Sequence, residues 1–339
     1  MKSFNSEEFL PPSAMAYLTD VRVNDPDRSL RVAKARRRRE RLTIDGWLSI
    51  LAADHPARRV TGVGDNPVAM ANRHDYLARV ARVLLSDKVD GVMATMDIIE
   101  DLLVLHDLLH DHLRSADGRG LLDDKLLIAS LNRGGLAGVS WEMDDPLTGA
   151  APATCAEWNL DGAKFLLRIC DDDPASLVTM RAAAGAINEL NALRLPMFLE
   201  PLPAARSEKG YKVVKTADAL AKIAGVASAL GDSSRYLWLK LPYCENFGSV
   251  VRATTLPILL LGGEATGDPT QFMREIALAK NLGARGALVG RNVLYPGAED
   301  PLVVAEAVSG IIHSGWMADQ ALALARESAG GKQRFTDMF

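Results

Sequence analysis

Lys240 lies inside an apolar run, LWLKLP (237–242), whose length and side chains are typical of a buried strand. An ammonium group among such neighbours loses its hydration, so it must find a carboxylate partner or release its proton. A neutral lysine amine attacks ketones, and the protonated imine that forms withdraws electrons from an adjacent carbon–carbon bond. The sequence therefore favours imine chemistry at Lys240. The alternative, on the residues alone, is a structural ion pair.

Two carboxylates and a second lysine complete this hypothesis. Glu200 closes another apolar run and is suited to transfer protons as a general acid and base. Asp54 follows a third run and could orient Lys240 or bind substrate hydroxyls. Lys164 lies within a fourth run, and a second cation near Lys240 would lower the pKa of that lysine further. Glu200 or Asp54 could equally be only an ion-pair partner, and Lys164 could point to solvent.

Glycines after two late apolar runs suggest a phosphate site. Gly262 and Gly263 follow one run, and Gly290 and Arg291 follow the next. Glycines at such positions let backbone N–H groups approach an anion, and many (β/α)8 barrels bind phosphate after their last two strands. Arg291 could instead be a surface arginine that begins a helix. Three further polar residues at strand ends are candidates for substrate contact: His55, Asn132 and Arg168.

Eight apolar runs alternate with segments of helical periodicity along most of the chain. This alternation predicts a (β/α)8 TIM barrel, because eight strand–helix units are the number that closes one. An open doubly wound sheet is the competitor, but no GxGxxG motif opens one here. The predicted strands are 49–53, 91–95, 126–130, 163–168, 196–200, 236–241, 257–261 and 286–290. The predicted helices are 68–85, 98–113, 177–193, 217–230, 270–282 and 301–312.

The barrel is expected to span residues 45–318, between an N-terminal extension (1–44) and a C-terminal tail (319–339). The extension contains RVAKARRRRERL (31–42), which we interpret as a basic helical segment that faces solvent, with an oligomer contact and an anion-binding arm as the alternatives. The stretch 132–160 is long for a loop between a strand and a helix. Because it follows a strand end, we expect it to lie over the barrel mouth.

Composition indicates small-molecule partners. The net charge of -4, from 39 basic and 43 acidic residues, provides no positive field for nucleic acid. The first residues lack the apolar stretch of a secretory signal, and no run approaches the ~20 apolar residues of a membrane span. We therefore expect a cytoplasmic protein without membrane partners. The 3 cysteines are far apart and form no CxxC pattern, so we expect reduced thiols, no metal and no cofactor. A homo-oligomer is expected for a barrel with additions.

Several of these motifs, in order and spacing, resemble those of class I tagatose-1,6-bisphosphate aldolases and archaeal-type fructose-bisphosphate aldolases. The resemblance covers roughly residues 45–315 and is strongest from residue 161 onward. It implies a TIM barrel, an imine on Lys240, an acid/base role for Glu200, and a substrate-binding role for Lys164. It also implies a phosphate site at Gly263 and Gly290–Arg291. The motifs are ILAADHP (50–56), DGAKFLLR (161–168), MFLEPL (197–202), LWLKLP (237–242), LLLGG (259–263) and GALVGRN (286–292).

The sequence also departs from these patterns. It reads DHP after the first strand where the tagatose type has DQR, and archaeal-type enzymes have a tyrosine at the position of Glu200. The whole chain is similar to an actinobacterial (β/α)8 group associated with inositol catabolism. That resemblance implies cleavage of 2-deoxy-5-keto-gluconate 6-phosphate to dihydroxyacetone phosphate and malonate semialdehyde.

Two other functions compete with an aldolase. The segment HDLLHDH (106–112) places His106 and His110 four residues apart, with His112 and Asp107 nearby, a spacing that can hold zinc in a lyase or hydrolase. The segment is expected inside a helix and away from the strand ends, which argues against it. A non-catalytic sugar-phosphate sensor could share the same fold and phosphate loops.

Overall fold

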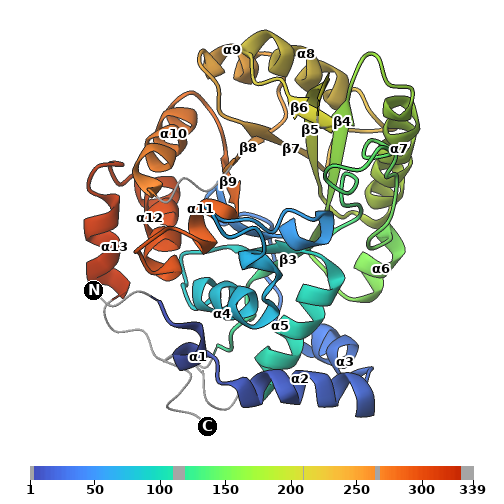
Figure 1. Ribbon diagram of the computed structural model, residues 1–339. Helices are drawn as coiled ribbons and strands as arrows, with labels where there is room; N and C mark the ends of the chain where they lie inside the picture. The colour runs from blue at the N-terminus through green and yellow to red at the C-terminus, as the bar shows by residue number, and fades with distance from the viewer. Residues whose placement is uncertain (1–3, 110–118, 209, 264–267, 330–339) are drawn as a thin grey trace.

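The chain folds as a closed barrel of parallel strands in a computed structural model that describes residues 4–109, 119–208, 210–263 and 268–329. The barrel strands are β1 (Leu48–Ala53), β2 (Gly91–Ala94), β3 (Leu126–Ser130), β4 (Gly162–Ile169), β5 (Met197–Ser207), β7 (Leu237–Pro242), β8 (Ile258–Leu261) and β9 (Gly286–Val289). They pair in that order, and the pairing of β9 with β1 closes the ring. Helices surround the ring (Figure 1). The predicted (β/α)8 TIM barrel is confirmed.

Each of the six predicted helical segments contains a helix. These are α4 (Arg73–Leu84), α5 (Met96–Leu108), α7 (Ala175–Leu193), α8 (Ala217–Ser228), α10 (Pro269–Asn281) and α12 (Pro301–Ser314). Capping residues set some of the bounds: α4 begins after Asn72, whose side chain accepts a hydrogen bond from Asp75 N, and not at Val68. None of the helices within the described residues is long and apolar enough to cross a membrane.

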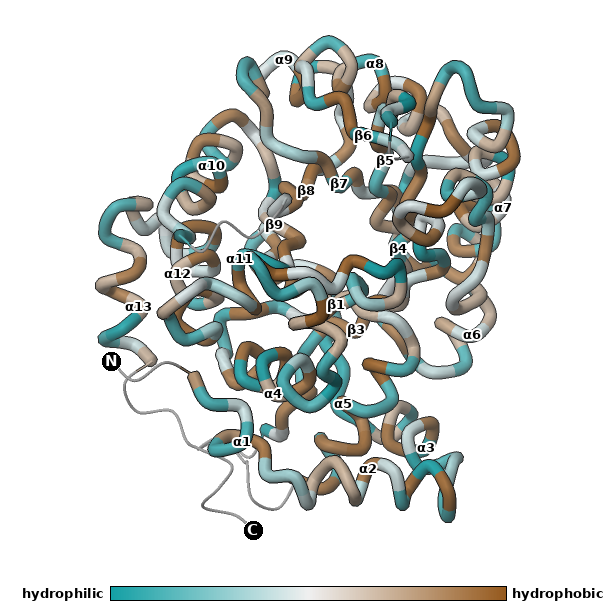
Figure 2. The backbone as a smooth tube through the Cα atoms, in the orientation of Figure 1, coloured by the Kyte–Doolittle hydropathy of each residue, from teal (hydrophilic) through white to brown (hydrophobic). Residues whose placement is uncertain are grey.

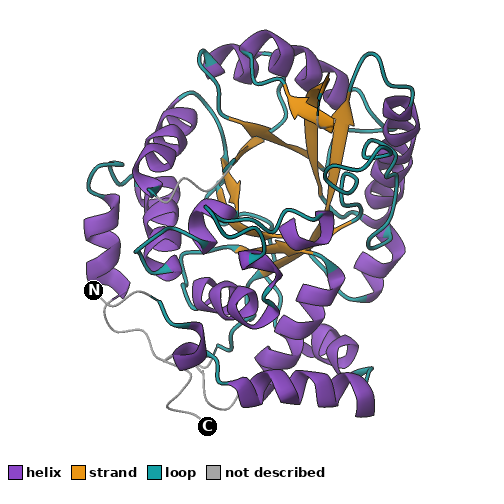
Figure 3. Cartoon of the chain, in the orientation of Figure 1, coloured by secondary structure: helices purple, strands orange, loops and turns teal. Residues whose placement is uncertain are grey.

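Shorter elements were not predicted. They are η1 (His55–Arg58), η2 (Ala69–Ala71), α6 (Pro152–Glu157), α9 (Phe247–Arg252), α11 (Arg291–Leu294) and α13 (Ala321–Ala329). In addition, β5 continues past Glu200 and pairs antiparallel with β6 (Gly210–Val213). This hairpin extends beyond the ring of strands that Figure 3 shows at the centre of the molecule.

Hydrophobic side chains form two groups, one on each side of the strands. Inside the barrel a small cluster is made by residues such as Ile50, Ile128, Phe198 and Leu259. A much larger cluster fills the space between the strands and the surrounding helices. Figure 2 shows hydrophobic residues along β7 and β8, with hydrophilic positions recurring in the outer helices. Because side chains alternate along a strand, most barrel strands contribute to both groups, whereas β4 contributes only to the larger outer one.

Three helices of the N-terminal extension pack on the outside of the barrel. They are α1 (Ser6–Phe9), α2 (Pro12–Asn24) and α3 (Arg28–Ala35), and they lie against α4 and α5 (Figure 1). The prediction of a helix over residues 31–42 is wrong beyond Ala35. Arg36 has extended backbone angles, and the chain continues without helical structure to β1.

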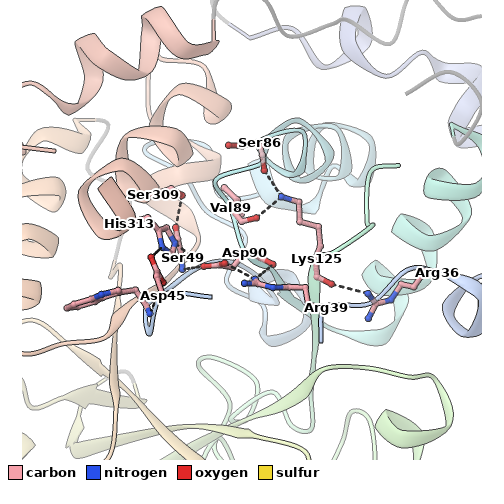
Figure 4. Close-up of polar contacts among 11 residues, drawn as sticks. Arg36, Arg39, Asp45, Ser49, Ser86, Val89, Asp90, Lys125, Ser309 and His313 are labelled. Atoms are coloured by element: carbon pink, nitrogen blue, oxygen red, sulfur yellow. Dashed lines mark hydrogen bonds and ion pairs between the residues drawn. The ribbon is translucent and has the colours of Figure 1, made fainter. Parts of the chain in front are cut away.

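Residues 36–39, all arginines, form a strap across the N-terminal end of the barrel. The buried Arg36 donates to Asp161 Oδ2 at 2.5 Å and to the carbonyl oxygen of Lys125 at 3.0 Å. Arg39 pairs with Asp90 at 2.7 Å. Asp90, Lys125 and Asp161 immediately precede β2, β3 and β4, so the arginine strap joins the starts of three strands. Figure 4 shows its contacts with Asp90 and Lys125. The helix ends before these arginines because their carboxylate partners lie at the starts of different strands.

The same end of the barrel also holds the last barrel helix in place. His313, near the end of α12, contacts Asp90 Oδ2 at 3.0 Å and Asp45 Oδ2 at 2.7 Å (Figure 4). Burial alone would lower the pKa of His313, but its hydrogen bonds and charge interactions with the two carboxylates raise it. Asp90 therefore ties together the arginine strap, β1 through Ser49 N, and α12.

Candidate active site

Strand alternation places four polar side chains on the inner face of the barrel at its C-terminal end. Ala52, Ile128 and Phe198 belong to the inner cluster, and the residues two positions later in the chain share their face. These residues are Asp54, Ser130 and Glu200. In the same way Trp238, which packs against the inner cluster, is followed by Lys240. The pattern in the sequence thus explains why these side chains converge above an apolar layer.

The two lysines and two carboxylates form a continuous chain of contacts. Lys240 Nζ lies 2.9 Å from Glu200 Oε2, and Lys164 Nζ lies 3.1 Å from the same oxygen. Lys164 Nζ also donates to Asp54 Oδ2 at 3.0 Å. Ser130 Oγ donates to that Asp54 oxygen at 3.1 Å. Lys164 is 2% and Lys240 6% exposed, so both ammonium groups are almost removed from water.

The two lysines have opposite pKa shifts although they share a carboxylate. Burial lowers the pKa of Lys240, and the nearby positive charge of Lys164 lowers it further, against the attraction of Glu200. Burial also acts on Lys164, but the charges of Asp54 and Glu200 raise its pKa above the ordinary value. Lys164 therefore holds the positive charge, and Lys240 is the lysine that gives up its proton more readily.

Both carboxylates are ionised in this arrangement. Burial opposes this state, but the charges of Lys164 and Lys240 lower the pKa of Glu200 to about 2. Lys164 and His55 hold the pKa of Asp54 well below its usual range in the same way. Glu200 is therefore unprotonated and accepts a hydrogen bond from Lys240 Nζ at 2.9 Å.

His55 lies on the β9 side of this cluster. Its ring approaches the backbone of Gly290, where an added Cβ would lie 2.4 Å from His55 Cε1 and 2.4 Å from the carbonyl oxygen of Ala52. Burial, assisted by the charge of Arg291 and opposed by that of Asp54, lowers the pKa of His55 to about 3. The imidazole is therefore neutral at pH 7. Its Nδ1 is buried and has no hydrogen-bond partner among the described residues.

Glycine is favoured after β8 and after β9 for different structural reasons. Gly263 has a φ of 66°, which favours glycine, and an added Cβ there would meet nothing within 4 Å. Gly290 is instead required by its close approach to β1. The two loops are joined, because Asn292 Nδ2 donates to the carbonyl oxygen of Gly262 at 2.5 Å. A phosphate bound at these loops stays a prediction.

Asn132 and Arg168 hold the loop that follows β3. Asn132 bonds to Asp145 O and to both backbone groups of Leu166, at 2.8 to 3.1 Å. Arg168 pairs with Glu142 at 2.5 Å and donates to the carbonyl oxygens of Glu142 and Gly134. Their polar groups thus fix the loop against β4. A role for either residue in substrate binding stays a prediction.

Sequence reasoning missed three residues of this region. Ser130 donates a hydrogen bond to Asp54, Glu142 pairs with Arg168, and Arg58 ends η1, the short turn that follows β1. A polar residue at the end of the apolar run LLIAS could have indicated Ser130. Arg58 lies in HPARR directly after the first strand, where a (β/α)8 barrel places functional residues. Glu142 lies in the irregular loop, and no sequence periodicity marks it.

The histidine segment lies apart from this site. His106 is buried on α5, accepts a hydrogen bond from Leu122 N at 3.2 Å, and lies 3.8 Å from Asp123. His110 and His112 are outside the described residues. Within the described part of the chain, no group of three or more histidine, cysteine, aspartate or glutamate side chains is arranged to hold a metal ion.

The fold and the lysine–carboxylate cluster at its C-terminal end define a (β/α)8 barrel of the kind that hosts lysine-based chemistry. The chain belongs to the Cgl0159-like family, whose model matches residues 46–311. The crystal structure of Cgl0159 from Corynebacterium glutamicum is 39% identical, with a TM-score of 0.83, and the match covers 91% of this chain and 99% of that one.

More distant similarities involve aldolases. A segment of 128 residues, 37% of this chain, is 33% identical to an uncharacterized aldolase of Saccharolobus solfataricus, but it covers only 44% of that protein. An archaeal fructose-1,6-bisphosphate aldolase, solved with its catalytic lysine covalently bound to a carbinolamine intermediate, is 21% identical with a TM-score of 0.54. That match covers 79% of this chain and 94% of the other, and at this identity it shows a shared fold.

Proposed function

We propose that this protein is a class I aldolase that cleaves or forms a carbon–carbon bond of a phosphorylated ketose or keto-sugar acid. The reaction passes through an imine on Lys240, needs neither metal nor cofactor, and releases dihydroxyacetone phosphate and an aldehyde. The observation that carries the proposal is the 2.9 Å contact between Lys240 Nζ and Glu200 Oε2, beside a second lysine that retains the positive charge. The partial match to a protein named as an aldolase supports it.

Imine formation uses the proton exchange between Lys240 and Glu200. Glu200 accepts a proton from the Lys240 ammonium group and leaves a neutral amine. The amine adds to the ketone carbon, and the carbinolamine loses its hydroxyl group as water when Glu200 returns the proton. Lys164 remains charged between Asp54 and Glu200 and binds substrate oxygens. The product of this half-reaction is a protonated imine on Lys240.

Bond cleavage then requires a base. Glu200 takes the proton of the hydroxyl group on the carbon that becomes the aldehyde. The electrons of the breaking carbon–carbon bond move to the imine nitrogen and leave an enamine. Protonation of the enamine carbon and addition of water to the resulting imine release dihydroxyacetone phosphate and return Lys240 to the amine. A carboxylate 2.9 Å from Lys240 can serve each proton transfer without a second base.

A particular substrate can also be proposed. The resemblance to a group associated with inositol catabolism leads us to propose 2-deoxy-5-keto-gluconate 6-phosphate, which gives malonate semialdehyde as the aldehyde product. Its phosphate is assigned to the Gly263 and Gly290–Arg291 loops. A cytoplasmic location and a homo-oligomeric assembly remain proposals from the sequence.

Borohydride trapping tests the proposed chemistry. Incubation of the intact protein with dihydroxyacetone phosphate and borohydride should reduce the imine to a stable secondary amine, which mass spectrometry detects as one added substrate residue per chain. A parallel sample with EDTA should give the same yield, and Lys240→Met should give none. A sensor without catalytic function predicts binding with no adduct. A metal-dependent lyase predicts activity that EDTA removes.

A further inference from the structure

The outward face of α7 exposes large apolar side chains at both ends of the helix. Leu177, Val178 and Leu193 are 50%, 47% and 42% exposed, and every other helix within the described residues has at most two large hydrophobic side chains this exposed. The helix lies at the outer edge of the molecule (Figure 1). Apolar side chains gathered on one element indicate a contact surface, whereas single scattered ones do not.

Gly185 lies at the centre of this outward face. Each buried residue of α7 lies about 100° or more around the helix from Gly185, at about 100° per residue. These buried residues are Ser176, Thr179, Ala183, Ala186, Ile187, Leu190 and Asn191. A Cβ added at Gly185 would meet nothing within 4 Å, so the fold of the chain itself does not require glycine there. Glycine is unfavourable inside a helix relative to alanine, but it lets another backbone approach closely.

The side chains before Gly185 are complementary to those after it. Arg181 and Glu189 lie four positions before it and four after it, and both are exposed. Neither makes a hydrogen bond or an ion pair in the part of the chain that the structure describes. Val178 and Ala192 lie seven positions before and after, which is two helical turns and therefore the same face. A second α7 in the opposite direction would thus present a negative charge to Arg181 and a small side chain to Val178.

We propose that α7 is the two-fold interface of a homodimer, in which two copies of this helix pack antiparallel about Gly185. Arg181 faces the partner's Glu189, and Val178 packs on the partner's Ala192. The two glycines meet at the axis and allow the helices to approach to the short end of the usual ~8–10 Å. A two-fold interface requires one surface that is complementary to itself, and the pairing of residues about Gly185 satisfies this requirement. The inference gives a surface to the homo-oligomer expected from the sequence and does not depend on the aldolase reaction.

An antiparallel pair of α7 helices leaves both candidate active sites open. The start of α7 lies at the C-terminal end of the barrel, where Thr179 Oγ1 donates to the carbonyl oxygen of Met143 in the loop after β3 at 3.0 Å. Its last residue, Leu193, precedes β5 at the N-terminal end of the barrel. The mouths of the two barrels therefore point in opposite directions. Variants of this face should leave imine formation unchanged.

Sedimentation equilibrium of the full chain tests the central glycine. The parent protein should have the mass of two chains. Gly185→Leu should weaken the dimer ~100-fold or more, because two leucines at the axis separate the helices. Gly225→Leu is the matched control, since Gly225 is an exposed glycine of α8 that also has nothing within 4 Å of an added Cβ. The control should keep the dissociation constant of the parent protein.

Charge reversal tests the pairing of the two helices. Arg181→Glu brings like charges together at two points of the interface and should weaken the dimer ~10-fold or more. Glu189→Arg should have the same effect, and the double variant should return to within ~3-fold of the parent dissociation constant. Arg181 and Glu189 are about 12 Å apart along one helix, which is too far for an ion pair within one chain. Recovery in the double variant therefore requires two chains.

A monomeric parent protein would overturn the proposal, and would leave the face to a different partner. A dimer that survives Gly185→Leu, or a double variant no tighter than the two single ones, would overturn it as well. If Gly185→Leu failed to fold, the charge reversals would still decide, because they change only exposed side chains. Borohydride trapping with dihydroxyacetone phosphate should be equal in all these variants, so a failure of the aldolase proposal is detected separately from a failure of the dimer.

Discussion

Buried cations are paired differently at the two ends of the barrel: two arginines have separate carboxylates at the N-terminal end, whereas two lysines share one carboxylate at the C-terminal end. At the N-terminal end, Arg36 and Arg39 are matched to Asp161 and Asp90, which begin different strands. At the C-terminal end, Lys164 and Lys240 share one oxygen of Glu200. An arginine cannot release its proton inside a protein, whereas a buried lysine can. The first end is therefore suited to hold strands together, and the second to move protons.

Substitutions at the C-terminal end of the barrel should therefore affect mainly activity, and substitutions at the N-terminal end mainly stability. A charge that serves chemistry should be removable with little loss of folding, because its burial is unfavourable to the fold. A charge that joins strands should be costly to unpair and have little direct effect on the reaction. Four variants test this distinction.

Lys240→Met should have the largest effect. We expect carbon–carbon cleavage to fall on the order of 10⁴-fold or more, because no imine can form. The urea midpoint of unfolding should stay the same or rise, since a buried ammonium group is replaced by an apolar side chain. Steady-state kinetics and urea titration measure the two quantities. Unfolding of this variant would remove the distinction between the two ends.

Asp161→Asn should reduce stability and leave activity almost unchanged. It leaves Arg36, whose side chain is 0% exposed, without its carboxylate, so we expect a loss of about 3–5 kcal/mol in the free energy of unfolding. The kcat of the folded fraction should change little. Arg37→Gln is the matched control, because Arg37 pairs with Asp124 at the surface with 53% of its side chain exposed. That variant should lose less than ~1 kcal/mol, and comparable losses in both would contradict the account.

Glu200→Gln should slow imine formation without abolishing it, and should slow cleavage as well. Removing the base should reduce kcat ~100-fold or more, while borohydride still traps the adduct on Lys240. Rapid-quench measurement of adduct formation and steady-state cleavage distinguish the two steps. Full cleavage activity in this variant would exclude Glu200 from the mechanism.

His313→Gln should change the free energy of unfolding least, and by an amount that depends on pH. The pKa of His313 is raised from the ordinary 6.5, so its stabilisation is fully present below pH 6.5 and is lost as pH rises through the folded-state pKa. The pKa of Asp90 is lowered from 3.8, so its contribution is present above that pH and is lost only in stronger acid. We expect a loss of about 1 kcal/mol near pH 5.5 and almost none at pH 9. Urea unfolding at both pH values measures it, and an equal loss at both would be inconsistent with the ion pair.

The fold could be predicted because the barrel strands are continuous apolar runs with helices between them. The convergence of Glu200 and Lys240 also followed from strand ends that meet at one end of a barrel. The β5–β6 hairpin could not be predicted in the same way, since its strands contain polar residues and two prolines in PLPAARS. Its pairing depends on contacts beyond the barrel, which local periodicity does not record.

The arginine strap shows a different limit of sequence reasoning. The run of arginines has helical propensity, but its carboxylate partners lie 51 to 125 positions away along the chain. Two of those partners, Asp90 and Asp161, occur in Asp-Gly pairs directly before predicted strands, which was an available signal.

Peptide mapping of the borohydride-trapped protein shows which lysine forms the imine. Lys240 and Lys164 both contact Glu200, and only Lys240 is expected to react. After treatment with dihydroxyacetone phosphate, the account predicts one modified peptide, with the added mass on Lys240. Lys164 should be unmodified in the same sample. An adduct on Lys164, or equal modification of both lysines, would contradict the assignment of the neutral amine to Lys240.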